Sequence, residues 1–339
     1  MPYVAAPTLS ELNLKQDRSD WQMRDACPAC TSPEIKDFAD VRNFGYDRCS
    51  DCGFVFANPA PSERAASEFY NSDFYDNYRA LEEENIRKTP YYSISSYTDP
   101  RRLAGWLTQE KAAKILDFGC GPASFIALLR DEFGFANVEG LELNANSAAV
   151  ADRSYGIKLA PDALHLKHKP YDVILMFEVI EHLPNPAHEI EQCRDLLAPG
   201  GQLFITTPSV RNIPARYFPS HCGHYTGPSH VSLFTEESMS RLLGRLGMKI
   251  VRMETDDAPL LGRAVTSPLY NLDIQSPQSS FDIDDALFVP NIMGRAAGLK
   301  PTRAVKSLPF RLVKRAESIA QRFVAGRFSD HLYLLAERV

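Results

Sequence analysis

The stretch that decides the fold is ILDFGCGPASF, residues 115–125. An apolar run rich in strand formers meets two glycines, and an apolar segment suited to a helix follows them. Gly119 and Gly121 remove Cβ atoms where a ligand must lie against the main chain, and the start of the following helix offers free N–H groups. A strand, a glycine turn and a helix in this order predict a nucleotide-type ligand at the first turn of a parallel sheet.

The sequence beyond this stretch alternates between strand and helix patterns. We expect helices over residues 124–134, 144–156, 185–201 and 235–247, the last capped by Thr235. Strands are expected over seven ranges: 114–120, 137–143, 157–160, 171–177, 202–208, 248–255 and 330–338. Such alternation predicts an α/β fold, a Rossmann-like and mostly parallel seven-stranded sheet with helices on both faces.

Three acidic residues stand at the ends of predicted strands. Asp117 would repel phosphates but suits a ligand that carries an ammonium and a sulfonium group. Glu142 lies 23 residues after Gly119, where an acid can accept both ribose hydroxyls, and Asp162 can accept from an adenine amino group. The third glycine of a dinucleotide fingerprint is absent, so the pattern indicates an adenosine ligand without phosphates.

Four of the seven cysteines form two close pairs near the N-terminus, with the spacing C-x2-C-x18-C-x2-C. Four thiolates in a tetrahedron are what structural zinc prefers, and residues between the pairs alternate enough for a short hairpin. A reduced thiol cluster or a redox pair is the alternative. We predict a zinc knuckle that buries little core and depends on its metal for folding, with the ligands Cys27, Cys30, Cys49 and Cys52.

Taken together, the motifs in residues 111–257 and the final strand resemble class I S-adenosylmethionine (SAM)-dependent methyltransferases. ILDFGCGPASF resembles the first motif of that family, GLEL its ribose acid, APDAL its adenine contact and YDVILMFEVIEHLPNP its fourth motif. Ala123 departs from the family, which usually has a glycine there. The resemblance implies SAM as cofactor, bound by Asp117, Gly119, Cys120, Gly121, Glu142, Leu143, Asp162, Ala163 and Phe177.

The zinc segment that leads into this region is similar to one in bacterial methyltransferases of deoxysugar, polysaccharide and natural-product pathways. That resemblance implies a small-molecule or glycan-type acceptor, with methyl transfer to oxygen as the expected reaction. Nucleotide-sugar C-methylation and RNA 2′-O-methylation are the alternative reactions, and a SAM-fold binding module is the non-enzyme alternative.

The sequence EVIEH after the fourth strand carries the expected catalytic groups Glu178, Glu181 and His182. In ubiquinone-pathway and small-RNA O-methyltransferases a similar motif binds a divalent metal, completed in the RNA enzymes by a histidine that corresponds here to His230. Such a metal would lower the pKa of an acceptor hydroxyl. In the competing interpretation His182 is a general base without metal. His221 and His224, in the loop after the fifth strand, are further candidates for the base.

The composition bounds the partners and the location. The formal net charge of −6 argues against broad, charge-driven binding of nucleic acid. The N-terminal residues lack a signal-peptide pattern, and no run reaches the roughly 18 apolar residues of a membrane span. These features predict a cytoplasmic protein.

Residues 258–328 separate the last two predicted strands and form a predicted helical, basic insertion. Eight Lys or Arg residues and one acid, Glu317, lie between Lys300 and Arg327, and apolar residues recur there at helical spacing. We expect an amphipathic helix with a solvated basic face; the alternatives are contact with a phosphate-bearing acceptor or with an anionic membrane surface. The predicted organisation is a zinc-binding segment (1–60), a helical cap or linker (61–110), a SAM-binding domain (111–257), this insertion (258–328) and a final strand (329–339).

Overall fold

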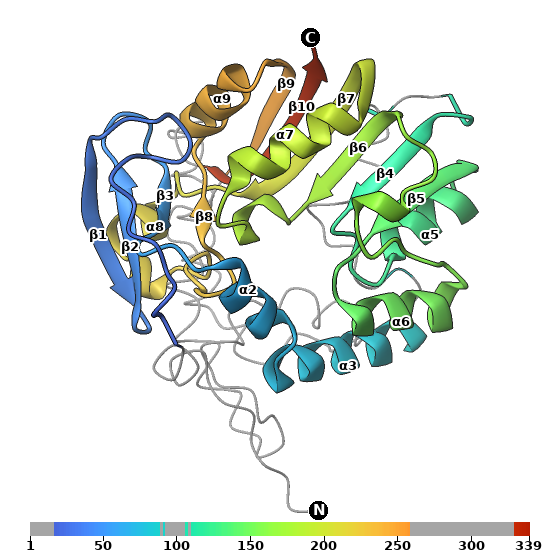
Figure 1. Cartoon of the computed structure of the whole chain (residues 1–339), viewed down its shortest axis with the longest axis horizontal. Helices are drawn as coiled ribbons and strands as arrows, with labels where there is room; N and C mark the ends of the chain where they lie inside the picture. Colours follow the sequence, from blue (N-terminus) through green and yellow to red (C-terminus); the bar gives the residue numbers. More distant parts are fainter. Residues whose placement is uncertain (1–16, 89–90, 92–105, 108–109, 258–328) are drawn as a thin grey trace, which may run out of the picture.

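The computed structural model describes residues 17–88, 91, 106–107, 110–257 and 329–339. Its main sheet has six strands in the order β5-β4-β6-β7-β10-β9 (Figure 1). These strands are β4 (Lys114–Phe118), β5 (Asn137–Leu141), β6 (Tyr171–Phe177), β7 (Leu197–Pro208), β9 (Met248–Asp257) and β10 (Ser329–Arg338). β4, β5, β6 and β7 pair in parallel, and β10 runs antiparallel to both of its neighbours. The predicted α/β class and Rossmann-like sheet are confirmed.

The expected seventh strand at 157–160 is wrong, because only one residue of it pairs with the sheet. Ala160 forms an isolated parallel bridge with Leu141. Its N–H donates to the oxygen of Gly140 over 2.8 Å, and its own oxygen accepts from the N–H of Glu142 over 3.0 Å. Pro161 follows directly and has no N–H to donate, so the ladder cannot continue.

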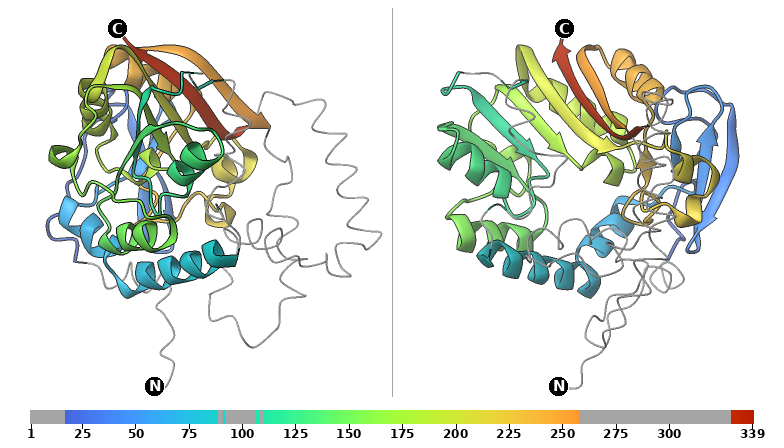
Figure 2. Two further views of the ribbon diagram at one scale, coloured as in Figure 1. Left: turned by 90° about the vertical axis from the view of Figure 1, so that its right-hand side faces the viewer. Right: turned by 180° about the vertical axis from the view of Figure 1, so that it is seen from behind.

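Helices cover both faces of the main sheet, as the alternation of its side chains requires. On β6, Val173 and Leu175 pack against one face with α5 (Ser124–Asp131), and Ile174 and Met176 pack against the other. That other face carries α7 (Pro186–Leu196) and α9 (Glu236–Arg245), as the two opposite views show (Figures 1 and 2). Residues that alternate along a strand point to opposite faces, so a strand apolar at every position is buried on both.

Residues 17–60, the four-cysteine segment, do not form the small, poorly buried knuckle that we expected. Their strands β1 (Ile35–Val41), β2 (Phe44–Cys49) and β3 (Val55–Ala57) form a second sheet, which β8 (Ser232–Leu233) completes in the order β1-β2-β3-β8. Phe54 and Phe56 are buried in the same core cluster as Phe234 and Met239. The segment therefore shares both a sheet and a core with a part of the chain about 180 residues away.

The predicted helical region after the four-cysteine segment contains α2 (Glu63–Tyr70) and α3 (Asp73–Lys88). α3 lies beside α6 (Ala145–Tyr155) (Figure 1), and an ion pair between Glu83 and Arg153 joins these two helices. Shorter elements complete the described fold: η2 (Ala163–His165), η3 (Ile180–His182), α8 (Ile213–Tyr217) and η4 (Pro219–His221).

Two parts of the predicted organisation cannot be compared with the described residues. The basic insertion at 258–328 lies outside the described residues, and the domain boundaries stay a proposal. Within the residues that the structure describes, none of the helices has the length and apolar character that crossing a membrane requires.

Gly140 lies on β5, where the sheet packs too closely against α5 to leave room for a side chain. A Cβ at this position would lie 2.5 Å from Ile126 Cδ1, 2.6 Å from Leu159 Cδ2 and 2.7 Å from Cys120 Sγ. We expect Gly140→Ala to lower the free energy of unfolding by about 1–3 kcal/mol, because three side chains must move at once.

The matched control is Gly244→Ala, on α9, where a Cβ would meet no atom within 4 Å. Alanine in a helix should raise the free energy of unfolding by about 0.5–1 kcal/mol. Urea unfolding compares the two variants, and equal midpoints for Gly140→Ala and the wild type would contradict the expected crowding.

Candidate active site

The glycine turn that follows β4 has the geometry that its sequence predicts. Gly119 has φ +71°, and a Cβ there would lie 2.8 Å from Cγ2 of Val179. Its N–H donates to the oxygen of Leu141 over 2.9 Å, which ties the turn to β5. Glycine is required at this position by both its left-handed backbone and the close approach of Val179. Because Val179 follows β6, this contact also places the EVIEH motif beside the turn.

Two predicted carboxylates lie at the same edge of the sheet. Glu142 accepts from the N–H of Gly121 over 2.8 Å and from the N–H of Asn144 over 2.7 Å. Asp117 is only 4% exposed, and burial, together with the charge of Glu142, raises the pKa of Asp117 to about 7. A cation placed between these groups would favour the ionised form of Asp117.

The remaining predicted cofactor residues lie on both sides of this edge. Asp162 caps η2 by accepting from the N–H of Leu164 over 2.8 Å, and the hydrogen bond with His165 is the main reason that its pKa is lowered. Leu143 is 78% exposed, an unusual position for a leucine beside a glycine turn. The others are the half-buried Ala163 on η2, Cys120 in the glycine turn, and Phe177, whose ring packs edge-on against Phe125 and Phe204.

Three predicted catalytic residues form one compact group, the glutamate–histidine cluster: Glu181, His182 and His230. Their potential ligand atoms all lie within 4.8 Å of one another. Nδ1 of His182 lies 2.9 Å from the oxygen of Ser229, and Nδ1 of His230 lies 2.9 Å from the oxygen of His224. A carbonyl oxygen only accepts, so Nδ1 carries the proton in both rings. Nε2 is then the nitrogen that each ring can offer to a metal or a proton.

The carboxylate of Glu181 is buried and only partly hydrogen-bonded. It is 1% exposed, and its Oε2 accepts from Oγ1 of Thr207 over 2.9 Å. Its Oε1 lies 3.8 Å from Nε2 of His182 and has no hydrogen-bond partner among the described residues. Burial, and next the charge of Glu178, hold the pKa of Glu181 well above its usual range. A buried carboxylate oxygen without a donor is costly, and a bound cation would remove that cost.

Burial also sets the charge state of the two histidines. It lowers the pKa of His182 and holds that of His230 well below the usual value. Both rings are therefore neutral near pH 7, which is the form that ligates a metal or accepts a proton.

Glu178 lies outside the cluster, although the sequence suggested that it could share a metal there. It has φ +55°, and its Oε2 is 3.1 Å from Nε2 of His331 on β10. Burial raises the pKa of Glu178, but the charge of His331, its hydrogen bond and the charge of His182 outweigh burial and lower that pKa. The ring of His224 lies 6.0 Å from that of His331, and His221 lies in η4.

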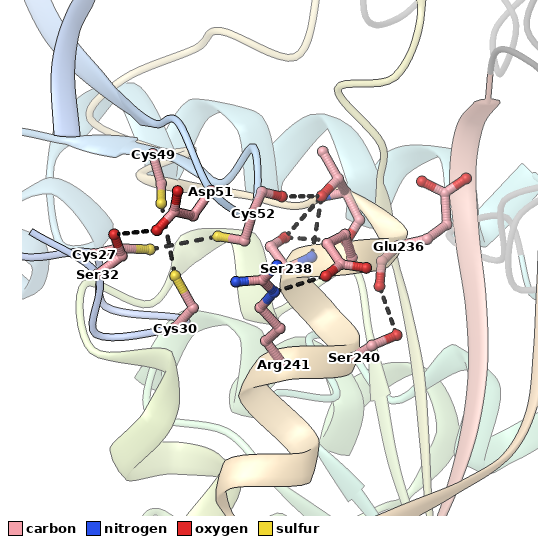
Figure 3. A network of polar contacts seen from close by, with 12 residues as sticks. Cys27, Cys30, Ser32, Cys49, Asp51, Cys52, Glu236, Ser238, Ser240 and Arg241 are labelled. Atoms are coloured by element: carbon pink, nitrogen blue, oxygen red, sulfur yellow. Dashed lines mark hydrogen bonds and ion pairs between the residues drawn. The ribbon is translucent and has the colours of Figure 1, made fainter. Parts of the chain in front are cut away.

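The four cysteines of the four-cysteine segment point toward one another (Figure 3). The Sγ atoms of Cys27 and Cys52 are 3.6 Å apart, as are those of Cys30 and Cys49. A tetrahedral zinc site with Zn–S bonds near 2.3 Å places its sulfurs about 3.8 Å apart. The hydrogen bond with Cys52 is the main reason that the pKa of Cys27 is lowered to about 5. Spacing, distances and donor type thus all fit zinc.

Part of this chain is similar in sequence to known methyltransferases. Residues 91–253 match the family described as "Methyltransferase domain". This match places a methyltransferase domain in that part of the chain, just under half of its length. A ubiquinone biosynthesis O-methyltransferase of Paraburkholderia xenovorans is 34% identical over 113 residues, which cover 31% of this chain and 47% of that protein. The enzyme of the same name from Xylella fastidiosa strain M23 is 33% identical over 108 residues, 28% of this chain and 42% of its own length.

The chain thus spans less than half the length of the curated relatives it matches. Among solved structures, the SAM complex of phosphoethanolamine N-methyltransferase 2 from Haemonchus contortus has a TM-score of 0.49 and 15% identity, and the match covers 84% of this chain and 61% of that one. A putative methyltransferase in complex with the Haloferax volcanii Trm112 activator has a TM-score of 0.46 and 14% identity, with coverages of 78% and 95%.

The structure adds residues to the methyltransferase domain's site that the sequence did not indicate. Arg79 on α3 places its Nη1 3.6 Å from the position of a Cβ on Gly121 and pairs with Glu82 and Tyr75. His331 is the other, and it is only 3% exposed. A histidine directly before the apolar run 332–336 of β10 is the one signal in the sequence that could have found it. No local pattern marks Arg79, because its place depends on how α3 packs.

Proposed function

We propose that this chain transfers the methyl group of SAM to a hydroxyl oxygen of a small-molecule or glycan-type acceptor. The glutamate–histidine cluster is the observation that carries the proposal. It follows β6, next to the glycine turn that Val179 touches, so it can hold an acceptor beside a cofactor bound at that turn. Curated relatives named O-methyltransferases match part of this chain, which supports transfer to oxygen.

The cofactor side of the site is proposed as follows. Glu142 accepts hydrogen bonds from the ribose hydroxyls, and Asp117 places a negative charge near the ammonium and sulfonium groups of SAM. The exposed side chain of Leu143 would be covered by the adenine ring, which removes apolar surface from water. The methyl transfer itself is a displacement at carbon, so the protein's main task is to align the acceptor oxygen behind the methyl group and to exclude water. The ring of Tyr70, 6.1 Å from that of His182, helps to close the site on the side of α2.

A divalent metal fits the acceptor side better than a lone base does. Oε1 of Glu181 and Nε2 of His182 and His230 would hold it, and the carbonyl oxygens of Ser229 and His224 fix both rings in the tautomer that ligation requires. A metal bound there lowers the pKa of an acceptor hydroxyl. The positive charge of the metal favours the ionised form of Glu181, whose pKa burial holds well above its usual range in the absence of a cation.

Glu181→Gln tests this assignment. We expect the zinc-loaded wild type to bind one Mn²⁺ per chain and the variant to bind it at least about tenfold more weakly, because the amide cannot replace a ligating carboxylate. The loss of the free Mn²⁺ signal in electron paramagnetic resonance measures the affinity. Label from isotope-labelled SAM should appear on a vicinal-diol or catechol probe, and only in the presence of the ion.

The matched control is Glu189→Gln, a half-buried carboxylate on α7 that lies outside the cluster. It should bind Mn²⁺ as the wild type does. If Glu181→Gln also binds it like the wild type, the metal assignment is wrong and His182 remains as the general base.

A further inference from the structure

The short stretch 229–233 lies between the four-cysteine segment and η3. Its central residue, Val231, donates its N–H to the oxygen of Glu181 over 2.8 Å. The oxygen of Val231 accepts from the N–H of Ala57, on β3, over 2.9 Å. One residue thus connects the backbone of the glutamate–histidine cluster to the sheet of the four-cysteine segment.

Tyr46 on β2 holds the same stretch from the position next to Ala57, its register partner in the sheet. Its hydroxyl donates to the oxygen of His230 over 2.9 Å and accepts from the N–H of Gly227 over 2.9 Å. The side chain is fully buried and contacts the ring of Tyr225 at 5.2 Å between centroids. A buried hydroxyl with one donor and one acceptor partner has a fixed orientation, so it fixes both backbone groups in turn.

We propose that Tyr46 is a positioning residue for the active site, acting through the backbone of residues 227–230. The inference rests on the proposed function, in which His182 and His230 hold the acceptor side. The hydroxyl of Tyr46 sets the backbone from which the ring of His230 projects, and the adjoining oxygen of Ser229 fixes the ring of His182. The four-cysteine segment thereby helps to position the active-site histidines, since its strand β2 supplies the hydroxyl that holds this backbone.

The alternative is that Tyr46 contributes only stability, as any buried and bonded tyrosine does. Tyr225 is the matched control, because it is 1% exposed, belongs to the same aromatic group and donates its hydroxyl to the oxygen of Ala215 over 2.9 Å. Tyr46→Phe and Tyr225→Phe each remove one buried hydroxyl and keep the ring. Their thermal midpoints should fall by similar amounts.

Two measurements on the zinc-loaded, full-length variants separate the interpretations. Mn²⁺ affinity should fall about tenfold in Tyr46→Phe and stay unchanged in Tyr225→Phe, as expected when a group that orients metal ligands is lost. The amide of Val231 should exchange with deuterium about three- to tenfold faster in Tyr46→Phe only. Replacing Tyr46 with 4-aminophenylalanine, which keeps a donor at the ring tip, should restore both values toward the wild type.

Each outcome decides the proposal. Equal Mn²⁺ affinity and equal exchange in the two phenylalanine variants would overturn it. If the wild type binds no Mn²⁺ beyond its zinc, the metal part of the proposed function fails, and the exchange rate at Val231 still decides whether Tyr46 positions this backbone. If Tyr46→Phe folds too poorly to assay, the 4-aminophenylalanine variant is compared with the wild type instead. Exchange at Val231 about tenfold faster than in the wild type, although the donor to the oxygen of His230 is kept, would overturn the role assigned to that donor.

Discussion

Glu142→Ala is expected to weaken SAM binding by at least about a hundredfold, since a charge-assisted hydrogen bond contributes about 1.5–3 kcal/mol and the carboxylate would accept from two ribose hydroxyls. Asp117→Ala should have a similar effect through the loss of the charge that faces the sulfonium. Calorimetric titration with SAM measures both variants. Their zinc content and circular dichroism should match those of the wild type.

The control is Glu132→Ala, an exposed carboxylate at the end of α5. Its affinity for SAM should equal that of the wild type. Unchanged affinity for SAM in both Glu142→Ala and Asp117→Ala would show that the cofactor does not bind at this edge of the sheet.

The same titration has a pH dependence that reports on Asp117. The pKa of Asp117 in the free protein is raised to about 7, so the carboxyl is mostly protonated at pH 6, and a cationic ligand must displace that proton to bind. The affinity should therefore fall about tenfold from pH 8 to pH 6, with release of a proton on binding. In Asp117→Ala this slope should vanish. A wild-type affinity independent of pH in this range would show that Asp117 does not face the charge of the ligand.

The sequence predicts those elements best in which the local pattern and the tertiary structure agree. β6 is apolar at nearly every position because both faces are covered, and its predicted bounds match the structure. The cap of α9 at Thr235 is also confirmed, since that side chain accepts from the N–H of Ser238 over 3.1 Å. These signals lie within a few residues of one another.

The predictions that failed depend on distant partners. The helix expected to end at the glycines of APGG ends at Leu196, because Leu197 already pairs with Tyr171 at the start of β7. β8 has two residues, too few to show a period, and it exists because β3 pairs with it. The same pairing explains why the four-cysteine segment is better buried than its length suggested.

The residues of the candidate site also fall into those that a local pattern predicts and those that depend on distant partners. Glycines and acids at strand ends are visible in the sequence because parallel strands bring their carboxyl ends to one edge. The grouping of His230 with Glu181 and His182 was available from the resemblance, and the structure places these three residues together. The roles of His331 and Tyr46 could not be assigned from the sequence, since they come from strands that meet the site from opposite ends of the chain.

Cys52→Ala should have the largest effect on folding. A structural zinc site contributes about 10–16 kcal/mol in small zinc-binding peptides, comparable with the whole stability of a domain. We expect the variant to lose its zinc and its thermal midpoint to fall by more than about 10 °C. The damage should reach beyond the cysteines, because Oγ1 of Thr235 donates to the oxygen of Cys52 over 2.8 Å, and β8 pairs with the strand that follows. Mn²⁺ binding at the glutamate–histidine cluster should therefore be lost together with the zinc.

Cys193→Ala is the control that separates metal loss from the loss of a buried sulfur. Cys193 on α7 is fully buried in the same core cluster as Cys52 but has no place among the four thiols. Removing its sulfur should cost about 1–2 kcal/mol and leave both zinc and Mn²⁺ binding intact. Elemental analysis and thermal melting compare the two variants. If Cys52→Ala retains one zinc per chain and melts together with Cys193→Ala, the four cysteines do not hold a structural metal, and their close approach then reflects a reduced thiol cluster.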